Sequence, residues 1–195
     1  SATAGYRAKW KYGISFRTDL SYARLQGDDA FSESQSRRQR NLHFKSNVLE
    51  LSAGANYSML APFARLRNRA SFDVYITLAG SGFYFNPKAD LKNTAHELQP
   101  LGTEGQGYNG TNKYSRFSFA VIGGIGYRKY FKDNQSIGIE LSLRSTYTDY
   151  IDDVSGNYPD EAELLANNGQ TAHELSYRGN DQFPSNQVRG NPALN

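Results

Sequence analysis

Three residues with the side chains of a hydrolytic site lie close together in the sequence, at His43, Ser46 and Glu50. Catalysis by such a group requires the serine hydroxyl within hydrogen-bond reach of the imidazole, and a carboxylate that orients the imidazole. Side chains three residues apart on a β-strand point to opposite faces of the sheet. The strand expected here therefore separates Ser46 from His43, and we predict no catalytic residues.

A second group of chemically capable side chains consists of carboxylates near the ends of the expected strands. They are Asp28, Asp29, Glu104, Asp149, Asp152 and Asp153. Calcium takes about six to eight oxygen ligands, which such a rim could supply together with loop carbonyls. The sequence has no contiguous calcium-binding loop and no cysteine, and His96 and His173 lack the spacing of metal ligands. We therefore favour solvated or turn-stabilising carboxylates, and predict neither a metal site nor a cofactor.

Basic residues form two candidate binding surfaces. The first consists of Arg65, Arg67, Arg69 and Lys132. It could dock an acidic partner through charge-assisted hydrogen bonds, although we favour cations that end strands beside lipid phosphates. The second consists of Arg37, Arg38, Arg40 and Lys45. It could contact lipopolysaccharide phosphates or be a solvated basic run.

The segment from Trp10 to Tyr22 sorts its residues with a period of two. One face carries Trp10, Tyr12, Ile14, Phe16, Leu20 and Tyr22, and the other carries Lys11, Gly13, Ser15, Arg17, Asp19 and Ser21. Because successive side chains of a strand point to opposite faces, this pattern predicts a sheet with one aromatic, apolar face and one charged face. Such sorting is typical of an outer-membrane β-barrel, with lipid outside and a polar lumen inside.

The same alternation recurs in two further segments, from Leu42 to Met59 and from Ile137 to Tyr150. Their polar faces contribute three more charged residues to the expected lumen. The five lumen residues are Arg17, Asp19, Glu50, Glu140 and Arg144. In a narrow barrel we expect these charges to interlock and to plug the lumen.

Strands over Ala4–Lys9, Phe72–Phe85 and Tyr114–Tyr130 bring the expected number to six. The connections between the strands alternate in length, as those of outer-membrane barrels do, with short periplasmic turns and long outer loops. We assign residues 61–70 and 131–135 to periplasmic turns, and residues 27–41, 86–113 and 152–195 to outer loops. A short helix is expected near Glu161–Ala166 in the last of these loops.

Composition excludes several classes of protein. The 195 residues have a mean hydropathy of −0.68 and contain no apolar run long enough for a transmembrane helix. The net charge of +3 is spread through the chain, so we expect no nucleic-acid partner. A closed barrel in lipid needs at least about eight strands. We therefore predict a single all-β domain over residues 1–195, an antiparallel up-and-down transmembrane barrel of eight strands whose first and last strands are absent from this chain.

Four segments together resemble the PorG-like outer-membrane barrels of Bacteroidota, in order and over most of the chain. They are Leu20–Asp29, Phe83–Ala89, Leu98–Gly107 and Thr148–Gly156. In that family an aromatic closing strand follows a stretch similar to Arg189–Pro192, and another strand precedes the segment that starts here. Neither strand is present in this chain.

The resemblance implies a structural component of the type IX secretion system, without enzymatic activity. Such a barrel ties the periplasmic ring, built from a lipoprotein and its partner, to the outer membrane, and its surroundings are outer-membrane lipids and lipopolysaccharide. Two alternatives remain open. One is a barrel enzyme acting on lipids, and the other is a small structural or adhesin barrel unrelated to secretion.

Overall fold

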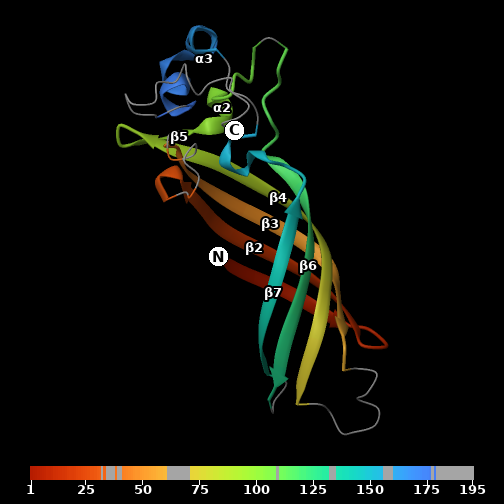
Figure 1. Cartoon of the computed structure of the whole chain (residues 1–195). Coiled ribbons are helices and arrows are strands. Elements are labelled where there is room, and N and C mark those ends of the chain that lie inside the picture. Colours follow the sequence, from red (N-terminus) through yellow and green to blue (C-terminus); the bar gives the residue numbers. More distant parts are fainter. Residues whose placement is uncertain are drawn as a thin grey trace. The chain divides into compact units, whose positions relative to one another are not determined.

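The protein, seen here in a computed structural model, is built mainly from antiparallel β-strands. The structure describes residues 1–31, 33, 38, 41–60, 71–108, 110–131, 135–155, 160–176 and 178. Seven strands within these residues form one sheet, in the order β1-β2-β3-β4-β6-β7, with the short β5 paired to β4 (Figure 1). The predicted antiparallel, β-rich fold is thereby confirmed. Strands β1 and β7 are the edges of this sheet.

The elements have the following bounds. The strands are β1 (Ala2–Lys9), β2 (Ile14–Asp28), β3 (His43–Ser58), β4 (Phe72–Leu91), β5 (Thr94–Glu97), β6 (Phe117–Tyr130) and β7 (Ser136–Thr146). The helical elements are η1 (Asp29–Phe31), α2 (Leu98–Leu101), η3 (Tyr150–Asp152) and α3 (Glu161–Ser176). Among the described residues, none of the helices combines the length and the apolar character that a membrane span requires.

The chain forms two compact units, where the sequence predicts one domain. Unit 1 contains residues 1–22, 49–84 and 117–147, and so holds most of the long strands. Unit 2 contains residues 23–48, 85–116 and 148–195, and so holds the ends of β2, β3 and β4 together with β5 and the helices.

The first hairpin differs from the prediction at its turn. β1 pairs with β2 from Ala2↔Tyr22 to Lys9↔Ser15, and residues 10–13 form the turn between them. Tyr12 and Gly13 have positive φ angles of 57° and 81°, which a strand does not permit. The predicted strand start at Trp10 is therefore wrong, because the turn takes up four residues of the alternating pattern.

Strand β4 extends beyond its predicted end at Phe85, to Leu91. It pairs with β6 as far as Tyr84↔Phe117 and then with β5 from Lys88↔Glu97. Pro87, which has no N–H to donate, lies between these two ladders, so it removes no hydrogen bond from either of them. The prediction of a loop throughout residues 86–113 is therefore wrong for β4, β5 and α2.

Strands β6 and β7 form a hairpin in register from Ala120↔Thr146 to Tyr130↔Ser136. Gly126 lies opposite Tyr75 on β4, and the Tyr75 ring occupies the space that a Cβ atom at Gly126 would need. Glycine is required at this point because an aromatic ring packs flat against the neighbouring backbone.

Unit 2 contains a small apolar core. Ala89, Leu98 and Leu175 are buried in it, and Phe44, Leu91 and Leu101 pack against them. Helix α3 starts after Asp160, whose Oδ1 accepts from the N–H groups of Ala162 (2.9 Å) and Glu163 (3.2 Å). The helix was predicted to be short and in fact continues to Ser176, with a kink at Gly169 (φ 83°). Residues 152–195 are therefore not a loop throughout.

Candidate functional site

The strands of unit 1 have one face that is mostly polar and buried, which we call the polar face. It carries the charged residues Arg17, Asp19, Glu50, Glu140 and Arg144. Their neighbours on this face include Ser52, Asn56, Thr77 and Ser81, each at most 6% exposed. Burial of so many polar side chains is unusual and requires that they bind to one another.

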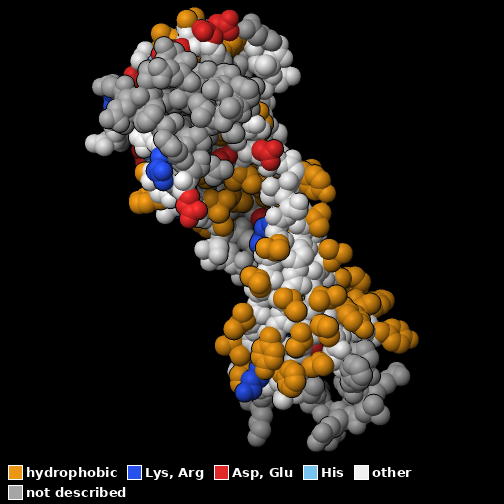
Figure 2. Space-filling model, viewed as in Figure 1, with side chains coloured by type: hydrophobic (Ala, Val, Ile, Leu, Met, Phe, Trp, Pro, Cys, Tyr) orange, Lys and Arg blue, Asp and Glu red, His pale blue; other side chains and the backbone are white. Residues whose placement is uncertain are grey.

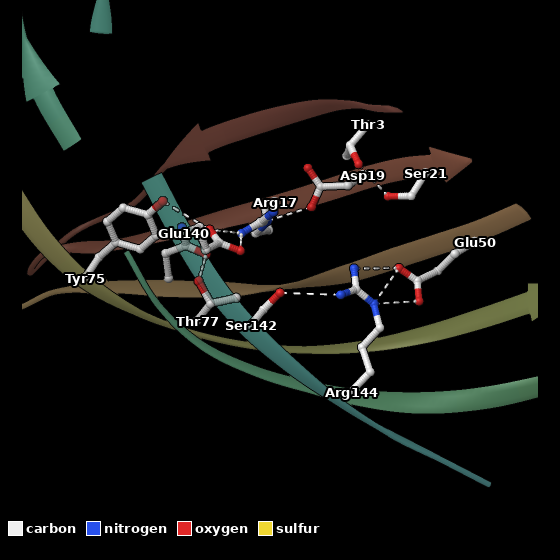
Figure 3. Close-up of polar contacts among 11 residues, drawn as sticks. Thr3, Arg17, Asp19, Ser21, Glu50, Tyr75, Thr77, Glu140, Ser142 and Arg144 are labelled. Carbon is white, nitrogen blue, oxygen red and sulfur yellow. Dashed lines mark hydrogen bonds and ion pairs between the residues drawn. The ribbon is translucent and has the colours of Figure 1, made fainter. Parts of the chain in front are cut away.

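Arg17 is the centre of the larger charge cluster on the polar face (Figure 3). Its Nε donates to Oδ2 of Asp19 at 2.6 Å, and its Nη1 donates to Oε2 of Glu140 at 2.6 Å. The hydroxyl of Tyr75 donates to the same Glu140 oxygen at 3.0 Å. Arg17 lies on β2 and Glu140 on β7, which are far apart in the strand order. The sheet of unit 1 must therefore curl toward its polar face for these side chains to meet.

Glu50 and Arg144 form the second cluster, also shown in Figure 3. The Nε and Nη2 of Arg144 lie 3.2 Å from the Glu50 carboxylate oxygens, and Ser81 donates to Glu50 at 3.3 Å. The Glu50 side chain is only 8% exposed, so its charge depends on this pairing. The contact joins β3 to β7, which again crosses the curled sheet rather than following neighbouring strands.

The opposite face of unit 1, which we call the apolar face, exposes large hydrophobic side chains. On β7 Ile139, Leu141 and Leu143 are 71–79% exposed, and on β4 Leu78 is 67% exposed. Figure 2 shows such side chains gathered over the strands of unit 1. Further members are Phe16, Leu20, Tyr22, Leu49, Leu51, Ile76, Phe117, Phe119, Ile125 and Ile137. A water-soluble protein rarely exposes so continuous an apolar surface.

Strand β4 reverses this sorting along its length. Every second residue from Asp73 to Ala89 is buried. In unit 1 these buried residues alternate in character, with the polar Asp73, Thr77 and Ser81 between Tyr75, Ala79 and Phe83. In unit 2 all three are apolar: Phe85, Pro87 and Ala89. On the other face, Ile76 and Leu78 give way to Asn86, Lys88 and Asp90. Along this one strand the exposed face therefore changes from apolar to polar, and the buried face changes from mixed to wholly apolar.

The residues considered for catalysis form no hydrogen bonds with one another among the described residues. Nε2 of His43 accepts from the Asp90 N–H at 3.4 Å, and its ring lies 3.1 Å from Arg178, in unit 2. Ser46 is fully buried, and its Oγ forms no hydrogen bond with the described residues. Glu50 binds Arg144 and Ser81, so the structure does not bring these three residues together.

Most of the carboxylates considered for calcium cap nearby backbone. Asp28 accepts from Ala30 N at 2.9 Å, Asp29 from Leu42 N at 3.2 Å, and Glu104 from Ser155 N at 3.0 Å. The described residues contain no group of three acidic, histidine or cysteine side chains placed to hold a metal ion.

The candidate docking residues Arg65, Arg67, Arg69 and Lys132 lie outside the described residues. Of the second basic surface, Arg37 and Arg40 also lie outside them, and Lys45 forms an ion pair with Asp90 at 2.5 Å. Asp90 is thereby partly neutralised, and the hydrogen bond from Lys45 lowers the pKa of its carboxyl.

One of the carboxylates considered for calcium, Asp153, is buried in unit 2, where the sequence favours a solvated or turn-stabilising side chain. Asp153 is 2% exposed and accepts hydrogen bonds from the hydroxyls of Thr103 and Tyr114. Burial raises the pKa of Asp153 to about 7, although these two hydrogen bonds oppose the shift. The ring of Tyr114 stacks on Tyr150, with 4.5 Å between centroids. Asp153 also has a positive φ of 70°, and nothing in its local sequence distinguishes it from the partly exposed Asp152.

A second network in unit 2 surrounds Glu97. Asn86 donates to its Oε1 at 2.8 Å, Lys88 lies 3.0 Å from the same oxygen, and Arg116 donates to Oε2 at 2.9 Å. The hydrogen bond from Asn86, with those from the two cations, lowers the pKa of Glu97 to about 2. These contacts fix β5 against β4 and the residues before β6.

Comparison with known proteins gives one match. Residues 3–170 match a family model described as "Domain of unknown function (DUF6089)". No curated protein and no solved structure matches the chain significantly.

Proposed function

The chain belongs to the DUF6089 family, and we propose that it is an outer-membrane β-barrel protein that serves as a structural component of the type IX secretion system. In this role it anchors the periplasmic ring, through a lipoprotein and its partner, to the outer membrane. The proposal has two parts, a barrel in lipid and an anchoring task, and different observations support them.

The reversal of sorting along β4 is the observation that carries the barrel. In lipid, a strand needs apolar side chains outside and can place polar ones inside, whereas in water the preference is the opposite. The residues of β4 in unit 1, Phe72–Tyr84, follow the first rule, and those from Phe85 to Ala89 follow the second. About 9 to 11 residues of a tilted strand cross the apolar core of a bilayer, so Phe72–Tyr84 is long enough to span it.

In the proposed barrel, closure gives hydrogen-bond partners to the backbone groups at the open edges of β1 and β7. Among the described residues β1 pairs only with β2, and β7 only with β6, which leaves two open edges. An open edge in lipid leaves N–H and C=O groups without hydrogen-bond partners, at a cost of several kcal/mol for each group. The proposed barrel of eight strands therefore has one further strand beside β1 and one beside β7.

The polar face suits a structural barrel better than a pore. Arg17, Glu140 and Tyr75 bridge the interior from three strands, and Glu50 with Arg144 bridges it a second time. Paired charges in a small barrel block the path of solutes instead of selecting among them. Transport of protein through this lumen is therefore not part of the proposed role.

The anchoring task rests on the resemblance to PorG-like barrels. Two of the four segments that carry it extend from unit 1 into unit 2 along β2 and β4, and the other two lie within unit 2. The proposed periplasmic contacts lie at the other end of the strands, where β1 turns into β2, β3 is followed by β4, and β6 by β7.

Site-directed photo-crosslinking in intact cells tests the anchoring. A photoreactive amino acid is placed at Tyr12, which is 80% exposed in the β1–β2 turn, and at Lys132 between β6 and β7. Asn93 in the β4–β5 turn, at the opposite end of β4, is the matched control. We expect Tyr12 and Lys132 to cross-link to a periplasmic lipoprotein of the secretion ring, and Asn93 not to do so. Cross-links to that lipoprotein from Asn93 alone would reverse the orientation, and a lack of them at all three positions would refute the anchoring role.

A further inference from the structure

The edge strand β1 carries a charge that its own sheet does not neutralise. Arg7 lies on the polar face, directly opposite Arg17 of β2. Like charges in directly opposite positions of neighbouring strands repel each other. Arg17 is neutralised by Asp19 and Glu140, but Arg7 forms no ion pair with any described residue.

The surroundings of Arg7 make the burial of its guanidinium energetically unfavourable. Its guanidinium lies over the Tyr75 ring, 5.5 Å from the centroid, and its Nε is buried without a hydrogen-bond acceptor among the described residues. A buried donor at a charged group loses its water and gains nothing in return. The Tyr75 ring offsets only part of that loss.

A second polar group that can bind a partner lies beside Arg7 at the same edge. The Asp19 side chain extends over Gly5, with Oδ1 in the space that a Cβ atom at Gly5 would occupy. The Arg17 bond uses Oδ2, so Oδ1 points along β1 without a hydrogen bond from the described residues. Gly5 and Arg7 are alternate residues of β1, so both groups lie on the polar face of one open edge.

We propose that the open edge of β1 binds an antiparallel strand that carries Asp or Glu opposite Arg7 and a hydrogen-bond donor opposite Gly5. In an antiparallel pair these positions are two residues apart, with the acidic residue first, and both point to the polar face. The carboxylate binds Arg7, and the donor binds Oδ1 of Asp19. This inference rests on the proposed barrel, since it specifies the strand that closes the barrel beside β1.

The sequence and the sheet disfavour two other occupants. A second copy of β1 contains no acidic residue, because Ala2–Lys9 has only Arg7 and Lys9 as charged residues. Strand β7 of the same chain has the single carboxylate Glu140, which Arg17 and Tyr75 already bind. The occupant is therefore a different strand, with a carboxylate of its own.

Neutral substitutions at two arginines test the proposal in the full-length protein, folded in lipid vesicles. Arg128 on β6 is the matched control, because it also lies over the Tyr75 ring (4.6 Å) but has Asp73 directly opposite. We expect Arg7→Met to lower the ratio of folded to unfolded protein in urea by about tenfold, since it leaves the proposed carboxylate without its partner. Arg128→Met should lower this ratio to a smaller extent, since it removes the cation directly opposite Asp73. Arg7→Lys, which keeps the charge, should retain most of the stability.

The opposite result is equally clear. If no carboxylate faces Arg7, Arg7→Met relieves its repulsion from Arg17, and stability stays unchanged or rises while Arg128→Met still lowers it. That outcome overturns the proposal. Insertion into vesicles is measured on the same samples, so wild-type protein that fails to insert contradicts the proposed barrel itself, and not the edge strand alone.

A disulfide test asks whether β7 occupies the edge. The sequence has no cysteine, so Tyr6→Cys with Ile139→Cys places a single pair on the apolar face. We expect no disulfide between these positions after oxidation. An intramolecular disulfide would show that β7 pairs directly with β1, and the proposal would be wrong.

Discussion

Unit 1 and unit 2 differ in the side chains that they bury and expose. The polar face of unit 1 buries Glu50, Asn56 and Thr77, while its apolar face leaves leucines and isoleucines exposed. Unit 2 buries Leu98, Leu175 and Ala89, as a protein in water does. β2, β3 and β4 run through both units. The difference therefore depends on the surroundings of each part of a strand, and not on the strand as a whole. Four predictions test this contrast, from the largest expected effect to the smallest.

The largest effect is expected from a charge on the apolar face. Leu143→Arg replaces a side chain that is 77% exposed on β7, and should cost about 2 to 4 kcal/mol if that face contacts the middle of a bilayer. The free energy of unfolding from vesicles measures this. Leu165→Arg, on a 42% exposed residue of α3, is the control and should change stability by about 0.5 kcal/mol or less. Equal effects at the two positions would remove the distinction between the units.

Unit 2 should respond to truncation of its core. Leu175→Ala removes a side chain that is 3% exposed, and should destabilise unit 2 by about 2 to 3 kcal/mol. Hydrogen exchange of the α3 amides should quicken accordingly, while exchange in β6 stays as in wild type. Leu165→Ala serves as the exposed control. Faster exchange in β6 as well would mean that the two units unfold together.

The charge clusters should matter more in unit 1 than in unit 2. Glu50→Gln leaves Arg144 without its carboxylate, and should lower stability by about 1 to 3 kcal/mol. The comparison is Glu174→Gln, which breaks the pair with the 79% exposed Lys92 and should have no measurable effect. If Glu50→Gln left the free energy of unfolding unchanged, the polar face would be open to water.

A pH effect is expected in unit 2 alone, from Asp153. Its pKa of about 7 in the folded state exceeds the ordinary value of 3.8, so the folded state binds more protons between these pH values. The stabilising contribution is complete below pH 3.8 and is lost as pH rises through 7. We therefore expect the opening of unit 2 to become easier between pH 5 and pH 8.

Asp153→Asn, which cannot ionise, provides the control for this effect. Urea unfolding at the two pH values, followed by the NMR signals of Tyr114 and Tyr150, should show a smaller pH dependence in this variant. An unchanged dependence would assign the effect to another group.

The secondary structure of unit 1 could largely be predicted from the sequence. Alternation is a local property, so the bodies of β2, β3, β6 and β7 and the face on which Arg17 and Glu140 lie follow from spacing alone. The prediction failed for the end of β4, where the pattern of polar and apolar residues changes within the strand. In β4 the exposed face changes from Ile76 and Leu78 to Lys88 and Asp90, while the buried face mixes polar and apolar residues as far as Phe83, so neither face is consistently apolar.

The end of β4 and the length of α3 also depended on distant residues. Pro87 is compatible with a strand only because β6 and β5 pair on either side of it, which no local pattern reveals. Helix α3 includes Gly169 and little apolar periodicity, and its Leu175 is held by contacts with Leu98 and Ala89.

The sequence by itself determined that this chain has strands with one polar and one apolar face, and which charges lie on the polar face. Only the tertiary structure decided which charges meet. Arg17 binds Glu140 on β7, while Arg7, directly opposite Arg17, forms no ion pair within the part of the chain that the structure describes. The physical reason is that side-chain direction along a strand is fixed by the pleat, whereas charge pairing across a curled sheet depends on strand order, register and curvature.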